Sequence, residues 1–206
     1  MIGILGGTFN PVHYGHLRSA LEVKEIFELT ELRLVLSAQP PHRDQPTAST
    51  ENRLKMLTLA IDEQPDLKID DRELNRSGPS YMVDTLKSIR DEIDTQPLLL
   101  FIGTDAFNQL THWHQWQALF DYAHIVVLTR PNYTPQSLND FFNKHLAKEH
   151  TELAQNSAGK LYFQSVRQLD ISATAIRNMI AEHKNPGFLL PDKVLTYIRQ
   201  QQLYLR

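Results

Sequence analysis

Short apolar runs alternate with longer amphipathic segments along the chain. The runs are rich in Val, Ile and Leu and are too short for helices, so each predicts a buried strand. The run from Leu98 to Ile102 has no polar alternation, as expected of a parallel strand that helices cover on both faces. Strands are predicted at residues 2–5, 32–36, 98–102 and 125–128, with weaker ones at 67–69 and 161–166.

Between these runs, apolar residues recur at helical spacing. Amphipathic helices are predicted within residues 17–27, 54–61 and 83–93, and a last helix from about 191 to 203. Strands that alternate with helices predict an α/β fold with right-handed crossovers and a ligand crevice at the carboxyl ends of the strands. The polar stretch 132–160 holds one amphipathic piece and is interpreted as a surface excursion rather than a second domain.

Composition narrows the chemistry that the chain can perform. It has 206 residues, a formal net charge of -3 and no cysteine. Disulfides, thiolate nucleophiles, Fe–S clusters and thiolate zinc sites are therefore excluded, and no global positive field exists for a nucleic-acid backbone. No apolar stretch reaches the roughly 18 residues of a membrane span, and the first residues lack the pattern of a signal peptide. We expect a cytoplasmic enzyme or binding protein without nucleic-acid or membrane partners; self-association is left open.

The first loop, residues 6–16, lies between a predicted strand and a predicted helix. Its paired glycines, Gly6 and Gly7, allow backbone N–H groups to approach a phosphate, although neither common nucleotide-binding glycine pattern is present. His13 and His16 are three residues apart, so within a helical turn both would face one anion. A tight corner with histidine caps and an H-x-x-H zinc site are the alternative interpretations, but no third zinc ligand is evident.

A second anion site is indicated at residues 170–177, which follow a predicted strand and open a helix. Ser172 or Thr174 would cap that helix, and Arg177 would supply a positive charge one turn later. An ordinary N-cap with a solvated arginine is the alternative. After the strand at 98–102, Asp105 is placed to accept hydrogen bonds from ribose hydroxyls.

Other groups lie near the same predicted rim of the sheet. Trp113 and Trp116 are either core anchors or, for one of them, a platform for a flat heteroaromatic ring. The loop at residues 40–43 carries Arg43, which is either another cation of the site or a solvated loop residue.

Together these motifs resemble one family. His13-Tyr14-Gly15-His16 fits the [HT]-x-G-H mark of a nucleotidyltransferase superfamily, and residues 171–177 fit its late I-S-x-T-x-I-R motif. Within the superfamily, the chain is similar to bacterial nicotinate-nucleotide adenylyltransferases over nearly its whole length. The resemblance implies a single domain, 1–206, with a Rossmann-like parallel sheet of the nucleotidyltransferase α/β phosphodiesterase type and a helical portion packed on it from about residue 171. The similarity rests on GGTFNPVHYGH at 6–16, PPHR at 40–43, SYMVDTL at 80–86, FIGTD at 101–105, the two tryptophans and YIRQQQLY at 197–204.

The resemblance implies transfer of AMP from ATP to nicotinate mononucleotide, giving deamido-NAD and pyrophosphate in NAD biosynthesis. Mg²⁺ would arrive on the ATP phosphates rather than on protein ligands. The attacking phosphate monoester is largely dianionic at neutral pH, so no general base is required, and catalysis reduces to alignment and charge neutralisation. By similarity, His16 stabilises the transition state, with His13 beside it.

The resemblance also assigns residues to the two substrates. Trp113 would stack on the pyridine ring, and backbone N–H groups near residues 82 and 114 would bind its carboxylate. The residues expected at ATP are Gly6, Gly7, Thr8, Phe9, His13, His16, Gly103, Asp105, Ser172, Thr174 and Arg177. Those expected at the mononucleotide are His42, Arg43, Met82, Thr85, Trp113, His114 and Arg130.

Two positions depart from the family pattern. Met82 stands where a threonine is expected, so a hydroxyl contact to the carboxylate is lost and the choice between the acid and the amide mononucleotide stays open. Asn10 stands where many relatives carry aspartate, which argues against a direct carboxylate contact to a metal ion.

Four other functions remain as alternatives. They are an adenylyltransferase for nicotinamide mononucleotide, a related cytidylyltransferase, a zinc hydrolase and a nucleotide-binding sensor without turnover. The intact His13, Gly15, His16 and Arg177 argue against a sensor, because sensing alone does not require residues that act on the transition state.

Overall fold

The computed structural model describes residues 1–39, 45–129, 138–167 and 169–205. Within them, six strands form one sheet in the order β3-β2-β1-β4-β5-β6, with every neighbouring pair parallel. The predicted α/β fold and its six strands are confirmed. The sheet order changes direction between β1 and β4, and ligands bind at such a switch point outside the carboxyl ends of the strands. The strands are β1 (Ile2–Gly7), β2 (Glu31–Leu36), β3 (Leu67–Asp70), β4 (Leu98–Gly103), β5 (His124–Thr129) and β6 (Leu161–Ser165).

Helices follow the strands, and the four helices that the periodicity predicts are among them. They are α1 (Tyr14–Ile26), α2 (Thr50–Ile61), α3 (Met82–Ile93), α4 (Thr104–Asn108), α5 (Leu119–Tyr122), α6 (Asp140–His145), α7 (Ala173–Ala181) and α8 (Asp192–Gln200). Short 3-10 turns are η1 (Arg72–Asn75), η2 (Leu110–His112), η3 (Trp116–Ala118) and η4 (His150–Gln155). The last helix ends before the predicted residue 203, because Gln202 and Tyr204 adopt left-handed backbone angles and the chain turns back.

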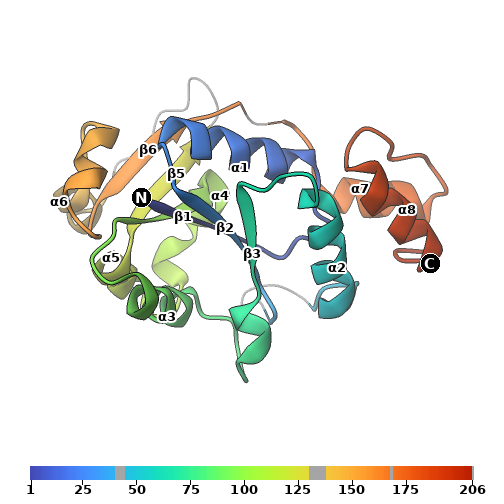
Figure 1. The fold of residues 1–206 in the computed structure, drawn as a ribbon, viewed down its shortest axis with the longest axis horizontal. Helices are drawn as coiled ribbons and strands as arrows, with labels where there is room; N and C mark the ends of the chain where they lie inside the picture. Colours follow the sequence, from blue (N-terminus) through green and yellow to red (C-terminus); the bar gives the residue numbers. More distant parts are fainter. Residues whose placement is uncertain (40–44, 130–137, 168, 206) are drawn as a thin grey trace.

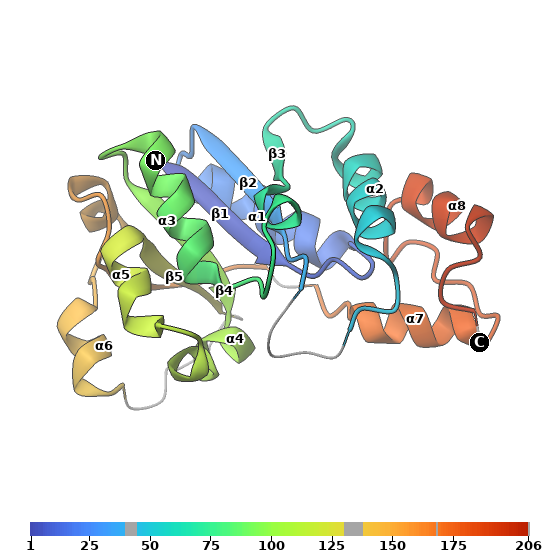
Figure 2. The same ribbon diagram turned by 90° about the horizontal axis from the view of Figure 1, so that it is seen from below.

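Alternate residues of the central strand enter different halves of the core. Leu99 and Phe101 pack in a cluster with α1, α2, α7 and α8, whereas Leu98, Leu100 and Ile102 pack in a cluster with α3, α4, α5 and α6. Figure 1 shows α1 along one face of the sheet, and Figure 2 shows α3, α4 and α5 on the opposite face. Covering both faces explains why β4 carries no polar alternation.

The polar stretch after β5 is joined to the core by aromatic side chains. Phe142 of α6 is 5% exposed, and its ring lies 5.2 Å from that of Trp116. Phe120 and Phe141 extend the same cluster. Trp116 is therefore a core anchor, one of the two interpretations that the sequence left open.

The C-terminal helices lie beside α2 at one end of the molecule (Figure 1). Lys193 of α8 donates to Asp62 at 2.9 Å and to Glu63 at 2.8 Å, just beyond the end of α2. Tyr197 donates to Asn52 Oδ1 at 2.7 Å. Among the described residues, no helix combines the length and the apolar character that a membrane crossing requires.

Candidate active site

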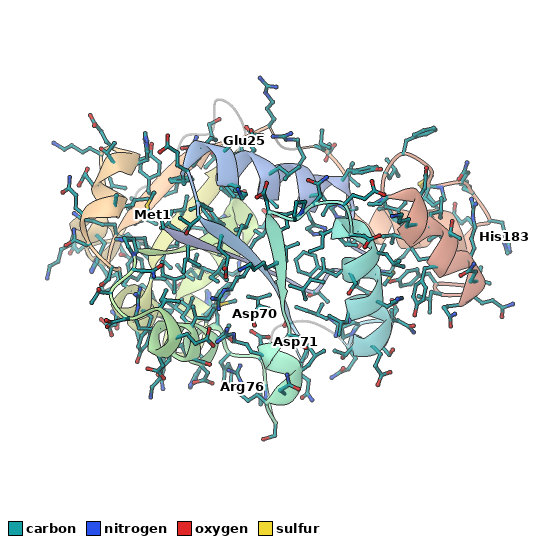
Figure 3. The ribbon with its side chains drawn as sticks, in the orientation of Figure 1. Met1, Glu25, Asp70, Asp71, Arg76 and His183 are labelled. Carbon is teal, nitrogen blue, oxygen red and sulfur yellow. The ribbon has the colours of Figure 1, made fainter. Side chains whose placement is uncertain are left out.

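The loop after β1 begins where the sheet order changes direction. Because the strands are parallel, their carboxyl ends lie at the same edge of the sheet, and the labels of Asp70 and Asp71 in Figure 3 show where β3 ends at that edge. A Cβ on Gly7 would come within 2.8 Å of the Phe9 ring, and Phe9 itself has a left-handed φ of 46°. The chain therefore turns sharply around that ring, and only glycine fits at position 7 without displacing it. Gly103, at the end of the neighbouring β4, is exposed and has open space where a side chain would point.

The two histidines of the first loop face each other, as their spacing predicts. His13 is the N-cap of α1, and its ring stacks on His16 with centroids 3.7 Å apart and planes at 26°. The backbone N–H of His13 donates to Nδ1 of His16 at 3.3 Å. Because Nδ1 is the acceptor, a neutral His16 carries its proton on Nε2.

Burial controls the charge of His13. His13 is 6% exposed, and burial lowers the pKa of its imidazole to about 4. Its Nδ1 is buried without a hydrogen-bond partner among the described residues. His13 is therefore neutral at pH 7, and the two rings stack without a positive charge on each. The expectation of two imidazoles meeting one anion is refined, because His13 would meet that anion as a neutral ring.

Position 15 brings a third segment to the pair. A Cβ on Gly15 would lie 3.0 Å from the His13 ring and 3.6 Å from the carbonyl oxygen of Ile171. The start of α1 therefore lies against the segment that leads into α7. In the described part of the chain, no group of three or more His, Cys, Asp or Glu side chains could hold a metal ion, so the histidine pair has no third zinc ligand there.

The second predicted anion site joins the first. Ser172 is the residue that caps α7, since its side chain accepts from the N–H of Ala175 at 3.3 Å. Arg177 donates to the carbonyl oxygen of Asn10 at 2.8 Å and to Oγ1 of Thr174 at 3.1 Å. Arg177 is thus half-buried and held against the first loop, which contradicts the alternative of a solvated arginine.

Asn10 connects the first loop to two further segments. Its Oδ1 accepts from the Tyr204 hydroxyl at 2.8 Å, and its Nδ2 donates to Thr47 Oγ1 at 3.1 Å. Burial raises the pKa of Tyr204, which keeps this phenol protonated as the donor. Both ends of the Asn10 amide are therefore engaged within the protein.

The residues expected at the mononucleotide approach the same loop from α3. Met82 begins α3, and its Cε lies 2.9 Å from the place of a Cβ on Gly6. The preceding Tyr81 stacks on His114, with ring centroids 4.2 Å apart. Trp113 packs, half-buried, on the α3 side of the core. His42, Arg43 and Arg130, also expected at the mononucleotide, lie outside the described residues.

Two further residues expected at the substrates, Asp105 and Thr85, differ in their exposure to solvent. Asp105 is exposed in the first turn of α4, directly after β4, and its contact with a ribose stays a prediction. Thr85 is fully buried, and its hydroxyl donates to Glu73 Oε1 at 2.7 Å. α3 therefore turns the Thr85 hydroxyl toward η1 and away from solvent, and the expected contact between Thr85 and the mononucleotide stays a prediction.

Comparisons with known proteins show the family to which the chain belongs. Residues 4–179 match the cytidylyltransferase-like family. The chain is 50% identical to the probable nicotinate-nucleotide adenylyltransferase of Methylococcus capsulatus, with 100% of both chains covered. It is 44% identical to the protein of the same name from Hahella chejuensis, with 98% of this chain and 95% of the other covered. This chain belongs to the nicotinate-nucleotide adenylyltransferase family.

Solved structures of such adenylyltransferases share the fold. The Plasmodium falciparum nicotinic acid mononucleotide adenylyltransferase complexed with NaAD superposes with a TM-score of 0.75 at 16% identity, covering 98% of this chain and 96% of the other. A putative nicotinate-nucleotide adenylyltransferase from Vibrio parahaemolyticus superposes with a TM-score of 0.64 at 16% identity, covering 98% and 94%. These superpositions confirm the Rossmann-like sheet expected of the family.

Arg53 was not among the residues predicted from the sequence, yet it is buried beside the first loop. The side chain is 1% exposed and donates to backbone carbonyls of the loops that follow β1 and β2. A signal was present, because residues 53, 57 and 61 recur every four positions and so place Arg53 on the same helix face as Leu57 and Ile61. An arginine on an apolar face predicts a buried guanidinium with backbone acceptors.

Proposed function

We propose that this chain, acting as a single domain, transfers AMP from ATP to nicotinate mononucleotide, giving deamido-NAD and pyrophosphate. The observation that carries the proposal is the convergence of both family motifs at one point. Arg177 of the late motif donates to the carbonyl of Asn10, three residues before the stacked His13 and His16. The 50% identity to a full-length relative named for this reaction supports the choice of substrates.

The reaction joins two anions. A phosphate oxygen of the mononucleotide attacks the α-phosphorus of ATP, a new P–O bond forms, and the bond to the pyrophosphate leaving group breaks. The monoester is largely dianionic at neutral pH, so the attack needs no proton acceptor from the protein. The protein must align the two groups and stabilise the charge on the α-phosphoryl oxygens.

His16 is proposed as the donor to those oxygens. The N–H of His13 occupies Nδ1 of His16, so the Nε2–H group is the one directed at a ligand. A preorganised donor of this kind acts most strongly on the transition state, where negative charge spreads over the equatorial oxygens. His13 stays neutral and fixes the ring plane of His16 by stacking.

The outer phosphates of ATP are proposed to lie between the first loop and the start of α7. The glycine turn offers backbone N–H groups, and the first turn of α7 adds N–H groups and a favourable helix dipole. Arg177 already connects these two elements and supplies a positive charge. Asp105 is proposed to accept from the ribose hydroxyls of the same nucleotide.

The mononucleotide is proposed to lie beside Met82, Trp113 and His114. Trp113 would stack on the pyridine ring, with one face packed on the core. Met82 has no hydrogen-bond donor in its side chain, so backbone N–H groups at the start of α3 would read the carboxylate. His42, Arg43 and Arg130 remain proposed contacts of the mononucleotide from the family resemblance.

Mg²⁺ is proposed to enter on the ATP phosphates. The described residues supply no carboxylate cluster for it, and the Asn10 amide is engaged with Thr47 and Tyr204. When bound to the phosphates, the ion would neutralise part of their charge. Both substrates carry phosphate charges, which are costly to move through a bilayer, so we place the enzyme in the cytoplasm, with ATP.

Pyrophosphate release from Mg·ATP tests this function, with nicotinate mononucleotide and nicotinamide mononucleotide as parallel acceptors. We expect a kcat/KM at least about tenfold higher for the acid, because a carboxylate gains charge-assisted hydrogen bonds that an amide lacks. Equal rates or a preference for the amide would contradict the acceptor assignment while keeping the chemistry. Binding of ATP without release on either acceptor would contradict catalysis and favour a nucleotide-binding sensor.

A further inference from the structure

We infer that Arg53 is a positioning residue for nucleotide binding, which aims a backbone N–H of the first loop at the phosphates and sets the spacing of the two loops that flank the site. The inference rests on the proposed function for the identity of its ligand, a nucleoside triphosphate. Arg53 lies on α2 and belongs to neither family motif.

One guanidinium holds both loops. Nη1 of Arg53 donates to the carbonyl oxygen of Thr8 at 2.9 Å and to that of Ser37 at 2.6 Å. Nη2 donates to the carbonyl oxygen of Ala38 at 3.1 Å and to Oγ1 of Thr50 at 3.1 Å. Thr8 follows β1, whereas Ser37 and Ala38 follow β2 and lead toward residues 40–43. The fixed fork of Arg53 therefore sets the separation of the ATP loop and the loop expected at the mononucleotide.

The peptide after Ala38 shows how this contact directs a backbone. In a planar trans peptide, the C=O and the following N–H point in opposite directions. The carbonyl of Ala38 accepts from Arg53, and the N–H of the same peptide, on Gln39, donates outward to Ser80 Oγ at 3.0 Å. Arg53 thus orients this peptide across the gap between α2 and the segment before α3.

The peptide between Thr8 and Phe9 is oriented by Arg53 in the same way, but its N–H group lacks a protein acceptor among the described residues. Its carbonyl accepts from Arg53, so its N–H, on Phe9, points away from the guanidinium. That N–H finds no acceptor among the residues that the structure describes. Phe9 is only 2% exposed, and a buried N–H without an acceptor is costly. A phosphate oxygen of ATP would satisfy it.

The positive charge of Arg53 also favours the binding of an anion at the first loop. Its side chain forms no ion pair with any carboxylate in the described part of the chain, and its four acceptors are neutral oxygens. Burial lowers the pKa of the guanidinium, yet arginine stays protonated at neutral pH. An uncompensated cation directly behind the first loop gives that loop a positive potential, which favours a polyanion in front of it.

Arg90 provides a matched control. It too is an arginine on a helix, α3, and it donates to main-chain carbonyls, those of Asp94, Gln96, Tyr122 and Ser157. All four residues precede strands, so Arg90 binds the amino ends of the sheet. Within the described residues, its hydrogen bonds reach no residue of the proposed site.

The experiment compares Arg53→Lys with Arg90→Lys. Lysine keeps the charge but lacks the fork, so both variants lose carbonyl contacts. For Arg53→Lys we expect KM for ATP to rise about tenfold or more, since small misplacements of a binding loop have effects of that size, and kcat to change less. Arg90→Lys should lower the midpoint of urea unfolding and leave KM within about twofold.

Two further measurements separate positioning from stability. The Phe9 amide signal in ¹H–¹⁵N spectra should shift when ATP is added to the unmodified protein and to Arg90→Lys, and should shift much less in Arg53→Lys. If Arg53→Lys does not fold, Thr50→Val replaces it as the test, because this variant removes one side-chain acceptor of Arg53. Thr50→Val should raise KM for ATP about two- to threefold. Thr50→Val with an unchanged KM would overturn the inference in that case.

Two results would overturn the inference in folded variants. The first is that KM for ATP rises in both Arg53→Lys and Arg90→Lys, in proportion to the stability that each variant loses. The second is that the Phe9 amide signal of the unmodified protein does not shift when ATP is added. Failure of the proposed function is distinguishable, because it would appear as ATP binding with a Phe9 shift but without pyrophosphate release.

Discussion

The two ends of the parallel sheet use the same kinds of buried side chain but complete their hydrogen bonds differently. At the carboxyl ends, Arg53 and His13 are buried next to the first loop. At the amino ends, Arg90 binds the carbonyls before the strands, and His124 is buried at the start of β5. Nε2 of His124 bonds to a carbonyl at 2.9 Å, and its Nδ1 accepts a backbone N–H at 3.1 Å.

The difference lies in the atoms left without partners. Nδ1 of His13 and Nε of Arg53 are buried and unpaired within the described residues, whereas Arg90 and His124 have each side-chain nitrogen either paired or open to solvent. Native structures keep few unsatisfied buried groups, and those that persist often mark function. The amino end of the sheet is therefore organised for stability, and the carboxyl end retains unpaired groups beside the place where the nucleotide is proposed to bind.

The largest expected effect comes from removing the proposed transition-state donor. His16→Ala should lower kcat by about 10²- to 10³-fold, the range for losing one preorganised donor, and leave the fold intact. His124→Asn should instead lower the free energy of unfolding by about 1–3 kcal/mol, because it breaks two buried hydrogen bonds, with kcat within about twofold. Pyrophosphate release and urea denaturation measure the two effects. A folded His16→Ala with near-full turnover would remove His16 from the mechanism.

The second prediction concerns pH. The pKa of His13 is about 4 in the folded chain, against an ordinary value of 6.5. Between these values the unfolded chain binds more protons, so stability is lost as the pH falls, by about 1.4 kcal/mol per unit and about 3 kcal/mol in total. His13→Asn, which places a favourable N-cap residue at the start of α1, should show a shallower loss of stability from pH 7 to pH 5 in urea titrations. The same slope in both proteins would contradict a neutral, buried His13.

The third and smallest effect compares two tyrosines of the C-terminal segment. Tyr204→Phe removes a hydroxyl that donates to Asn10 Oδ1, and Tyr197→Phe removes one that donates to Asn52 Oδ1. Each should cost about 1 kcal/mol of stability, the typical net value of one hydrogen bond. Only Tyr204→Phe should also raise KM for ATP, by a few fold, because Asn10 belongs to the first loop. Equal KM values in initial-rate measurements would show that this loop does not depend on its C-terminal contact.

Local patterns predicted much of this molecule. The apolar runs located all six strands, and the spacing of His13 and His16 predicted that they share one face. The pairing of an early and a late motif indicated the family, which full-length relatives confirm. These features depend on residues near one another in sequence, or on a chemistry that only a few residue types supply.

The remaining features depend on tertiary contacts. Thr85 lies in a segment that resembles a substrate-binding one, yet the packing of α3 on η1 buries it against Glu73. The bond from Arg177 to Asn10 spans 167 positions, and no spacing rule reaches that far. The spacing along α2 indicated that Arg53 lies on the apolar face of the helix. Its acceptors are backbone carbonyls, however, and their directions are set only when the loops fold.

Histidine spectra of the protein, titrated with pH and then with Mg·ATP, test the central claim most directly. We predict that His13 titrates with a pKa of about 4 and that His16 carries its proton on Nε2. We also predict that ATP shifts the His16 ring signals while those of His124 stay in place. A His13 that titrates near 6.5, or a response of His124 as large as that of His16, would contradict the assignment of chemistry to the carboxyl end of the sheet.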